Sequence, residues 1–294
     1  MPEGGGDRPK TAFVLAGGGS LGAVQVGMLH SLAARNITAD IVVGSSVGSL
    51  NGAYYAGNPT QEGVANLAKI WRGLRREDVF PVGLRAFFGF LLRRDYLVAA
   101  DGVRTLVENN LPYRKLEEAK VPIHVVATNM LTGATVVLSE GSAADAIVAS
   151  AAIPVVFPPV QFRNLYLVDG AVSSNTAVKV AVQQGATRLI VLPTGYACAL
   201  DKPPEGAIAR ALHAITLLIA RQLLSELQEL DGTGIEYFVL PPLCPLTGSP
   251  YDFSQTDSLI ERAIKSTDAW IADGGLERSN IHTQLSIHKH SNQH

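Results

Sequence analysis

The sequence predicts one α/β domain, a three-layer sandwich in which helices cover both faces of a mostly parallel central sheet. Two observations predict it. Short apolar runs alternate along the chain with segments of helical periodicity, and no linker-like break or internal repeat interrupts the alternation. The 294 residues are 47% hydrophobic and 17% charged, which is typical of a folded protein with a large core.

The first third of the chain is expected to contain strand 12–16, a glycine turn, helix 21–34, strand 41–43, a second tight turn, and helices 47–55 and 60–72. Helix 21–34 is predicted because Val24, Met28, Leu29 and Leu32 recur at helical spacing. Helix 47–55 is expected to stop at Gly57-Asn58-Pro59, since proline cannot continue a helix. Residues 74–100 are less regular.

The rest of the chain repeats the alternation. The pattern predicts helix 101–109, strands 123–127 and 134–138 joined by a hairpin-like turn, helix 143–150, strand 165–168, helix 178–184, strand 188–192, helix 208–230, strand 237–240 and helix 258–272. The polar or Gly- and Pro-rich ends predict flexible tails over 1–10 and 281–294, which flank a domain of residues 11–280.

Charge and cysteine content narrow the function classes. The formal net charge is -2 with no basic stripe, which argues against a nucleic-acid partner. Cys198 and Cys244 have no spacing motif, so we expect free thiols in a reducing compartment. Residues 1–10 lack the apolar stretch of a secretory signal, and no run approaches about 20 apolar residues. We expect a cytoplasmic protein with no metal and no cofactor.

The glycine turn after the first strand predicts an anion-binding site. Gly17, Gly18, Gly19 and Gly22 leave backbone N–H groups bare, and these groups suit a negative oxygen such as a tetrahedral oxyanion. The same glycines also satisfy G-x-G-x-x-G, the dinucleotide fingerprint. That alternative is disfavoured because it wants an acidic residue at the end of the second strand, whereas Asp40 precedes that strand.

The turn after the second strand predicts a nucleophile. Gly44-Ser45-Ser46-Val47-Gly48 fits the G-x-S-x-G elbow between a strand and a helix, with Gly44 and Gly48 framing the bend. In that geometry the hydroxyl of Ser46 is pushed out above the sheet, and Ser45 is left to local hydrogen bonding. We therefore expect Ser46 to be the attacking group.

A serine nucleophile needs a base, and the histidines do not supply an obvious one. His30 lies in a predicted helix, His124 in a strand and His213 in the long helix, while the others lie near the C-terminus. Asp169 ends the strand over 165–168, and strand ends are where ligands bind in open α/β folds. It is the candidate base, although Asp-Gly is also a common turn pair.

Taken together, these motifs resemble those of the patatin-like phospholipases. The resemblance rests on four blocks that occur in the family's order. They are the Gly-Gly-Gly-x-x-Gly turn, the Ser46 elbow, the block Ser150-Ala151-Ala152-Ile153-Pro154-Val155-Val156-Phe157-Pro158-Pro159 and the sequence Asp169-Gly170-Ala171. It covers roughly residues 12–195.

The resemblance implies a patatin-like fold and a dyad of Ser46 and Asp169 without histidine. The amides of Gly18 and Gly19, with neighbours up to Gly22, would hold the oxyanion. Many members carry Arg or Lys where this chain has Leu21, which weakens the case for a phospholipid over a neutral ester. The implied activity is hydrolysis of carboxylic esters of lipids through an acyl-enzyme. The alternatives are an acyltransferase with the same dyad, a non-catalytic lipid-binding protein with a vestigial site, and a hydrolase with a histidine triad.

Two segments bear on partners. Residues 84–94 combine phenylalanines and leucines with arginines. They could form a flap over the site or a peripheral membrane contact. The alternative is a core helix with an exposed arginine end. The helix over 208–230 carries leucine and isoleucine at helical spacing, which favours core packing or a homodimer over lipid contact.

Overall fold

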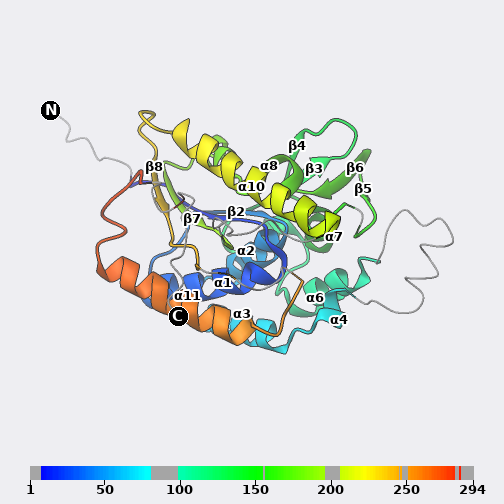
Figure 1. Ribbon diagram of the computed structural model, residues 1–294, viewed down its shortest axis with the longest axis horizontal. Helices are drawn as coiled ribbons and strands as arrows, with labels where there is room; N and C mark the ends of the chain where they lie inside the picture. Colours follow the sequence, from blue (N-terminus) through cyan, green and yellow to red (C-terminus); the bar gives the residue numbers. More distant parts are fainter. Residues whose placement is uncertain are drawn as a thin grey trace.

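The computed structural model describes residues 8–80, 99–154, 156–195, 206–244, 246, 251–281 and 285. It confirms the predicted α/β fold with a mostly parallel central sheet, and Figure 1 shows helices on both faces of that sheet. Two apolar cores result, one on each side of the sheet: Phe13 and Leu15 point into one, Ala12 and Val14 into the other. The alternation follows from strand geometry, since successive side chains point to opposite faces.

The strands are β1 (Thr11–Leu15), β2 (Ile41–Ser45), β3 (Ile123–Asn129), β4 (Thr135–Leu138), β5 (Val160–Phe162), β6 (Leu165–Asp169), β7 (Arg188–Leu192) and β8 (Glu236–Val239). Their order is β5-β6-β3-β2-β1-β7-β8, with β4 also paired to β3. β3, β2, β1, β7 and β8 run parallel, while β4, β5 and β6 form antiparallel pairs at one side. The sequence did not predict β5.

The antiparallel pairing brings two strand ends together. Val125 and Val126 of β3 pair with both β2 and β4, so those two strands lie on opposite edges of β3. Ala127 and Thr128 pair with both β4 and β6, so β6 lies on the same edge as β2. β2 therefore runs up this edge and β6 runs down it, and the strands meet end to end at Ser45 and Asp169.

The helices are α1 (Gly22–Ala34), α2 (Val47–Gly57), α3 (Gln61–Gly73), α4 (Arg76–Val79), α6 (Asp101–Asn110), α7 (Ala143–Ser150), α8 (Ala171–Ser174), α9 (Val178–Gln183), α10 (Ala207–Gln228) and α11 (Thr256–Ala272). Short 3₁₀ turns span Gly19–Leu21 and Leu116–Glu118. The predicted helices lie within about two residues of these bounds, which is the usual uncertainty at helix ends. The short helices α4 and α8 were not predicted.

The C-terminal helix completes the layer that holds the N-terminal helix (Figure 1). α11 packs along α1, and a Cβ on Gly27 of α1 would lie 2.4 Å from the carbonyl oxygen of Ile260 and 2.6 Å from the Cβ of Ala263. The hydroxyl of Ser31 donates to the carbonyl of Ile264 at 3.3 Å. The two backbones approach closely because glycine lacks a side chain at the crossing.

Four further predictions have different outcomes. Cys244 is disulfide-bonded, so the prediction of free thiols was wrong; a single distant cysteine partner leaves no spacing signal in the sequence. The segment 84–94 lies outside the described residues. The division into a domain 11–280 and two tails stays a prediction, as does the homodimer. Among the helices that the structure describes, none is long and apolar enough to cross a bilayer.

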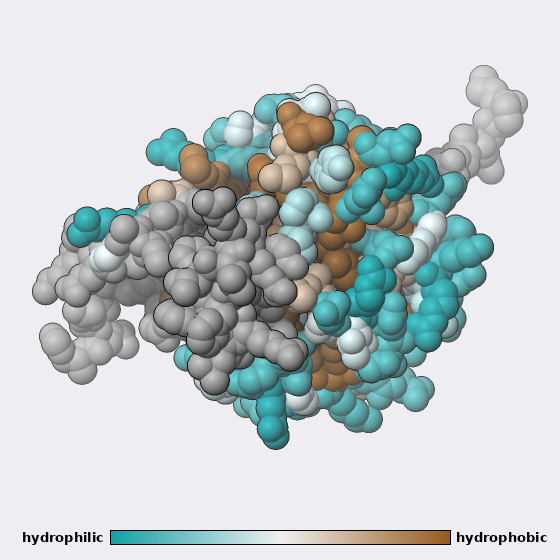
Figure 2. All heavy atoms as spheres, turned by 90° about the vertical axis from the view of Figure 1, so that its right-hand side faces the viewer, coloured by the Kyte–Doolittle hydropathy of each residue, from teal (hydrophilic) through white to brown (hydrophobic). Residues whose placement is uncertain are grey.

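The outer surface is mainly polar. Figure 2 looks at the side of the molecule that carries β3 to β6, and apolar residues there form a strip between polar ones. Exposed apolar groups on a folded protein often mark a binding surface.

Candidate active site

The turn between β2 and α2 holds Ser46 in a strained conformation. Its backbone angles are φ 53° and ψ -126°, in a region that residues with a side chain rarely adopt. The flanking glycines make the turn possible: a Cβ on Gly44 would lie 2.4 Å from the carbonyl oxygen of Gly48, and one on Gly48 would lie 2.3 Å from that of Leu15. The predicted elbow geometry is therefore present, and the turn packs against the end of β1.

Ser46 and Asp169 meet where β2 and β6 end. The Ser46 hydroxyl donates to Oδ2 of Asp169 over 2.7 Å. Both residues are almost closed off from solvent, with exposed fractions of 6% and 3%. The other carboxylate oxygen, Oδ1, accepts from the backbone N–H of Ala171 at 2.8 Å. That second bond fixes the carboxylate so that one oxygen faces the serine.

Burial changes the acidity of this carboxyl group. It raises the pKa of Asp169 from the usual 3.8 to about 6, although the hydrogen bonds from Ala171 and Ser46 lower it. The group is therefore ionised at neutral pH yet basic enough to accept a proton. A base with a pKa near the working pH is what general base catalysis requires.

The backbones around the pair are locked by side chains that sequence analysis did not single out as site residues. The Ser150 hydroxyl accepts from the backbone N–H of Ser46 at 2.8 Å and donates to the carbonyl of Val126 at 2.6 Å. Thr128 donates to the carbonyl of Asp169 at 2.9 Å. Ser150 opened the block quoted for the family resemblance, so a signal existed for it; nothing in the sequence pointed to Thr128.

Gly170 fits only because it has no side chain. A Cβ there would lie 2.2 Å from the carbonyl oxygen of Val126 and 2.5 Å from Oγ of Ser45. Ser45 is fully buried, and its hydroxyl has no hydrogen-bond partner among the described residues. The predicted Asp169-Gly170-Ala171 motif thus has a mechanical reason: glycine lets β6 end against β2, and alanine supplies the N–H for the carboxylate.

The glycine turn lies beside the serine. A Cβ on Gly17 would be 3.1 Å from the Cβ of Ser46. The N–H of Gly17 already donates to the carbonyl of Asn175, and that of Gly22 to the carbonyls of Gly19 and Ser20. Among the described residues, the N–H groups of Gly18 and Gly19 donate to no protein acceptor. Of the four predicted oxyanion residues, these two keep their amides available.

Close contacts hold the turn in place. The hydroxyl of Thr194 donates to the carbonyl of Gly17 at 2.7 Å, and a Cβ on Gly18 would overlap the Thr194 side chain at 2.2 Å. Leu21 stands at the position where many patatin-like phospholipases carry Arg or Lys. Its Cδ1 is 3.8 Å from where a Cβ on Gly195 would lie, and Cδ1 of Leu246 is 2.5 Å from that point. Leu21 therefore sits in apolar surroundings.

A buried polar network ties the turn to the first two helices. Gln25 donates to the carbonyls of Ala16 and Leu192, at 2.8 and 2.9 Å. Asn51 donates to the carbonyl of Gly22 and to Oε1 of Gln25, at 3.0 and 2.9 Å, and its Oδ1 accepts from the Trp71 indole at 2.8 Å. Every polar atom of the two amides has a partner, so the network rigidifies the support of the turn.

The histidines whose side chains the structure describes are elsewhere. His30 is exposed on α1. His124 bonds the Ser139 hydroxyl through Nδ1 at 2.6 Å, and burial, together with the charge of Lys10, lowers its pKa. Asp169 thus occupies the hydrogen-bond position on Ser46 that a histidine would need in a triad.

Aromatic rings from three parts of the chain form a cluster around Phe80. Phe80 stacks on Phe157 with ring centroids 5.5 Å apart and meets Tyr251 edge-on at 5.4 Å, and Phe253 lies 6.5 Å away. Burial raises the pKa of Tyr251, and the negative charge of Asp169 raises it further, so this ring is within electrostatic range of the carboxylate.

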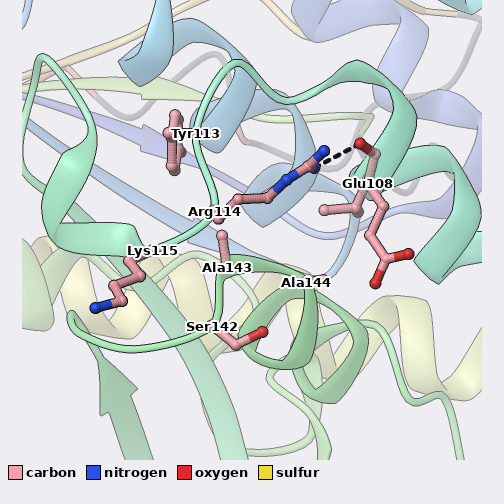
Figure 3. A pocket seen from close by; sticks show the side chains of 8 residues that line it. Glu108, Tyr113, Arg114, Lys115, Ser142, Ala143 and Ala144 are labelled. Carbon is pink, nitrogen blue, oxygen red and sulfur yellow. Dashed lines mark hydrogen bonds between the residues drawn. The ribbon is translucent and has the colours of Figure 1, made fainter.

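A cavity of about 480 Å³ lies apart from these residues, between the end of α6 and the start of α7 (Figure 3). Its lining includes Glu108, Arg114, Lys115 and Ser142, and Arg114 donates to the backbone carbonyl of Glu108 at 2.6 Å. It contains none of the predicted site residues. Within the described part of the chain, no cluster of side chains has the composition of a metal site.

Comparison with known proteins decides the family. The model of the patatin-like phospholipases matches residues 13–182, more than half of the chain, including both glycine turns and Asp169. This chain belongs to that family. The predicted resemblance is confirmed.

Curated relatives agree. The patatin-like phospholipase domain-containing protein 7 of Rattus norvegicus is 27% identical over 186 residues, covering 63% of this chain and 13% of the relative. Lysophospholipase NTE1 of Candida albicans is 23% identical over 292 residues, covering 89% of this chain and 20% of the relative. The chain therefore spans a fifth or less of the length of these two relatives.

A solved structure shows the same fold. Human GIVD cytosolic phospholipase A2, in complex with methyl gamma-linolenyl fluorophosphonate, has a TM-score of 0.50 and 12% identity, with 94% of this chain and 59% of that chain covered. At this identity the likeness extends to the fold alone.

Proposed function

We propose that this protein is a serine acyl hydrolase that cleaves carboxylic ester bonds of lipids through Ser46 and Asp169. The observation that carries the proposal is the 2.7 Å hydrogen bond from the Ser46 hydroxyl to a buried carboxylate whose pKa is raised to about 6. Membership of the patatin-like phospholipases and the lysophospholipase name of the Candida albicans relative support a lipid ester as substrate.

In the proposed first half-reaction, Asp169 takes the hydroxyl proton while Oγ of Ser46 attacks the ester carbonyl carbon. The carbonyl oxygen becomes an oxyanion, and the N–H groups of Gly18 and Gly19 donate to it. The intermediate collapses to an acyl-serine ester, and the leaving alcohol receives the proton from Asp169. The fixed position of the carboxylate, held by Ala171, keeps the proton path short.

In the second half-reaction, Asp169 deprotonates a water molecule that attacks the acyl carbon of the ester on Ser46. The same two amides stabilise the second oxyanion. Collapse releases the fatty acid, and the serine oxygen regains its proton from Asp169. Each atom of the pair is thereby restored, which is the requirement for turnover.

The surroundings favour an apolar acyl group. The pKa of Tyr251, whose ring meets Phe80 edge-on, is raised by burial and by the charge of Asp169. Leu21 contributes carbon rather than charge to the glycine turn. These features support a lipid acyl ester as substrate and make a neutral headgroup as acceptable as a phosphate.

The test uses a chromogenic short-chain ester and a fluorophosphonate probe with the full chain. We expect Ser46→Ala to abolish both ester turnover and probe labelling. Asp169→Asn should lower kcat/KM by about 10³-fold or more, since loss of a general base typically costs 10²–10⁴. Ser20→Ala, in the glycine turn, is the control for serine labelling elsewhere.

Other results would replace the proposal. Retained turnover in Asp169→Asn would contradict the role of the carboxylate. Labelling of Ser46 without hydrolysis of any ester would leave a lipid-binding protein with a vestigial site. Acyl transfer to added glycerol in preference to water, measured by product analysis, would make the protein an acyltransferase with the same pair.

A further inference from the structure

Large apolar side chains are exposed at one corner of the molecule. The structure describes six large hydrophobic residues with exposed side chains. Four of them come from segments next to the Ser46–Asp169 pair, and a fifth comes from α10. We call these five the apolar corner: Met130, Leu131, Tyr166, Val172 and Leu218. Their exposed fractions lie between 47% for Tyr166 and 77% for Leu131.

Hydrogen bonds bring these segments together. Met130, in the β3–β4 turn, donates its N–H to the carbonyl of Tyr166 at 2.8 Å. Thr128, at the end of β3, bonds the hydroxyl of Ser173, the neighbour of Val172, at 2.9 Å. Gln222 of α10 donates to the carbonyl of Ser173 at 2.6 Å. The segments that carry the five residues are thus joined to one another by hydrogen bonds.

Leu218 joins the corner through helix geometry. It precedes Gln222 by four residues, so the two side chains lie on one face of α10. Gln222 reaches Ser173 of α8, so this face of α10 is the one directed toward α8. Figure 1 shows the α10 ribbon in the same part of the molecule as α8, β3 and β4. The face shown in Figure 2 carries apolar residues in this part of the molecule.

The corner lies close to the reacting groups. Tyr166 and Val172 are each three residues from Asp169, one on β6 and the other on α8. Three residues of strand span about 10 Å. The β3–β4 turn follows the carboxyl end of β3, and the Ser46 elbow follows the carboxyl end of the parallel strand β2. Both therefore lie at the same end of the sheet.

Charge at the corner is sparse and positive. Residues 129–135, 160–168, 170–178 and 214–222 contain no Asp or Glu, and their only charged side chains are Arg163 and Arg221. Both arginines are exposed. Arg163 lies in the turn between β5 and β6, and Arg221 lies three residues after Leu218 on α10. Apolar groups flanked only by cations match the surface of an anionic bilayer, where side chains enter the interface and arginines meet headgroups.

We propose that the apolar corner docks this protein on an anionic lipid bilayer. The proposal rests on the proposed function, because a lipid ester is presented in a membrane and the corner lies next to Asp169. Leu131 and Met130 enter the acyl region, Tyr166 lies at the headgroup level as tyrosines do at membrane surfaces, and Arg163 and Arg221 contact lipid phosphates.

The experiment measures vesicle binding separately from catalysis. The full chain carries Ser46→Ala, so that the vesicles stay intact, and is sedimented with phosphatidylcholine vesicles that contain or lack phosphatidylglycerol. The variant Met130→Ser/Leu131→Ser removes the most exposed apolar groups. Ile281→Ser is the matched control, since Ile281 is the sixth exposed residue and lies outside the corner, with an exposed fraction of 39%.

We expect the parent protein to bind the anionic vesicles more tightly than the neutral ones. The double variant should lower the partition coefficient at least about tenfold, because removing one leucine-sized group from an apolar phase is worth about that factor. Arg163→Gln should weaken binding to anionic vesicles only, and Ile281→Ser should bind as the parent does. With Ser46 restored, the double variant should lower the ratio of vesicle turnover to soluble-ester turnover.

Three results would overturn the docking proposal. The first is that the parent protein does not bind anionic vesicles. The second is that Ile281→Ser loses as much vesicle binding as the double variant. The third is that the double variant shifts from dimer to monomer while no protein binds vesicles. The last result would make the corner a contact between copies of this chain. If no ester is hydrolysed but vesicle binding depends on the corner, the proposed function fails and the docking stands.

Discussion

The two halves of the sheet differ in what they contribute to the candidate site. The parallel half, β2-β1-β7-β8, is buried on both faces: every residue of β1 and β2 is buried. It supplies Ser46 and the glycine turn at strand ends. The antiparallel half, β3 with β4, β5 and β6, is partly exposed, and it supplies Asp169. A rigid half thus holds the nucleophile, and a more exposed half brings the carboxylate to it.

The largest effect is expected where the two halves touch. In Gly170→Ala the new Cβ would overlap the carbonyl oxygen of Val126 and the hydroxyl of Ser45, so β6 must shift away from β2. We expect a loss of about 3 kcal/mol in the free energy of unfolding. Ester turnover should fall about 100-fold, because a displacement of about 1 Å at reacting groups has that effect.

Gly73→Ala is the matched control for that change, since nothing lies within 4 Å of its added Cβ at the end of α3. Urea unfolding and the ester assay are the measurements. Equal stability and turnover in both variants would mean that the contact between β6 and β2 is looser than described.

A somewhat smaller effect is expected in the parallel half. Asn51→Ala leaves the indole of Trp71, the carbonyl of Gly22 and Oε1 of Gln25 without their partner in a buried region. Unsatisfied buried groups cost about 1–3 kcal/mol each, with incomplete additivity, and we expect a total of about 2–3 kcal/mol. Thermal unfolding should show this loss, whereas Asn66→Ala on the outer face of α3 should not.

The smallest expected effect is a pH-dependent change in the free energy of unfolding when the charge of Asp169 is removed. The pKa of Asp169 is higher in the folded protein, about 6, than its usual 3.8, so ionisation destabilises the fold. The protonated carboxyl group stabilises the fold relative to the ionised one. This contribution to the free energy of unfolding is complete below about pH 4 and is lost as the pH rises through about 6. Asp169→Asn should therefore raise stability by about 1 kcal/mol at pH 7.5, after loss of charge-assisted hydrogen bonds, and by less at pH 4.

Ester turnover should depend on the ionisation of Asp169 as well, but it should rise with pH where the free energy of unfolding falls. Because the ionised carboxylate is the proposed base, kcat/KM should rise with an apparent pKa near 6 and level off above it. A pH profile with no inflection between pH 5 and 7, together with an unchanged melting temperature in Asp169→Asn at pH 7.5, would mean that the carboxyl group is less buried than described.

Sequence analysis could predict the parallel half well because its signals are local. The glycines at 44 and 48 mark a bend that few other residues allow, and β1 and β2 read as continuous apolar runs. The expected strands and helices around Ser46 agree with the structure for that reason. The two side chains of the candidate pair are hydrogen-bonded in the structure, and their catalytic role stays a proposal.

The antiparallel half could not be predicted in the same way. Asp169 was expected at the carboxyl end of a strand beside others, whereas β6 runs against β3 and meets β2 end to end. Pairing direction depends on which strand edge is free, and no residue of β6 encodes that. Thr128, Asn175 and Thr194 bond main-chain groups across long sequence separations, so no spacing motif marks them.

The packing of α11 against Gly27 of α1 has a practical consequence for dissecting the chain. The family match ends at residue 182, before β7 and α11 begin. A fragment cut there would leave one edge of β1 unpaired and the glycine groove of α1 bare, and it would lack Leu192, an anchor of Gln25. The matched portion therefore lacks contacts that complete the sheet and the core. Expression boundaries should extend through residue 285, because Asn280 bonds Tyr237 of β8 and Leu285 is fully buried.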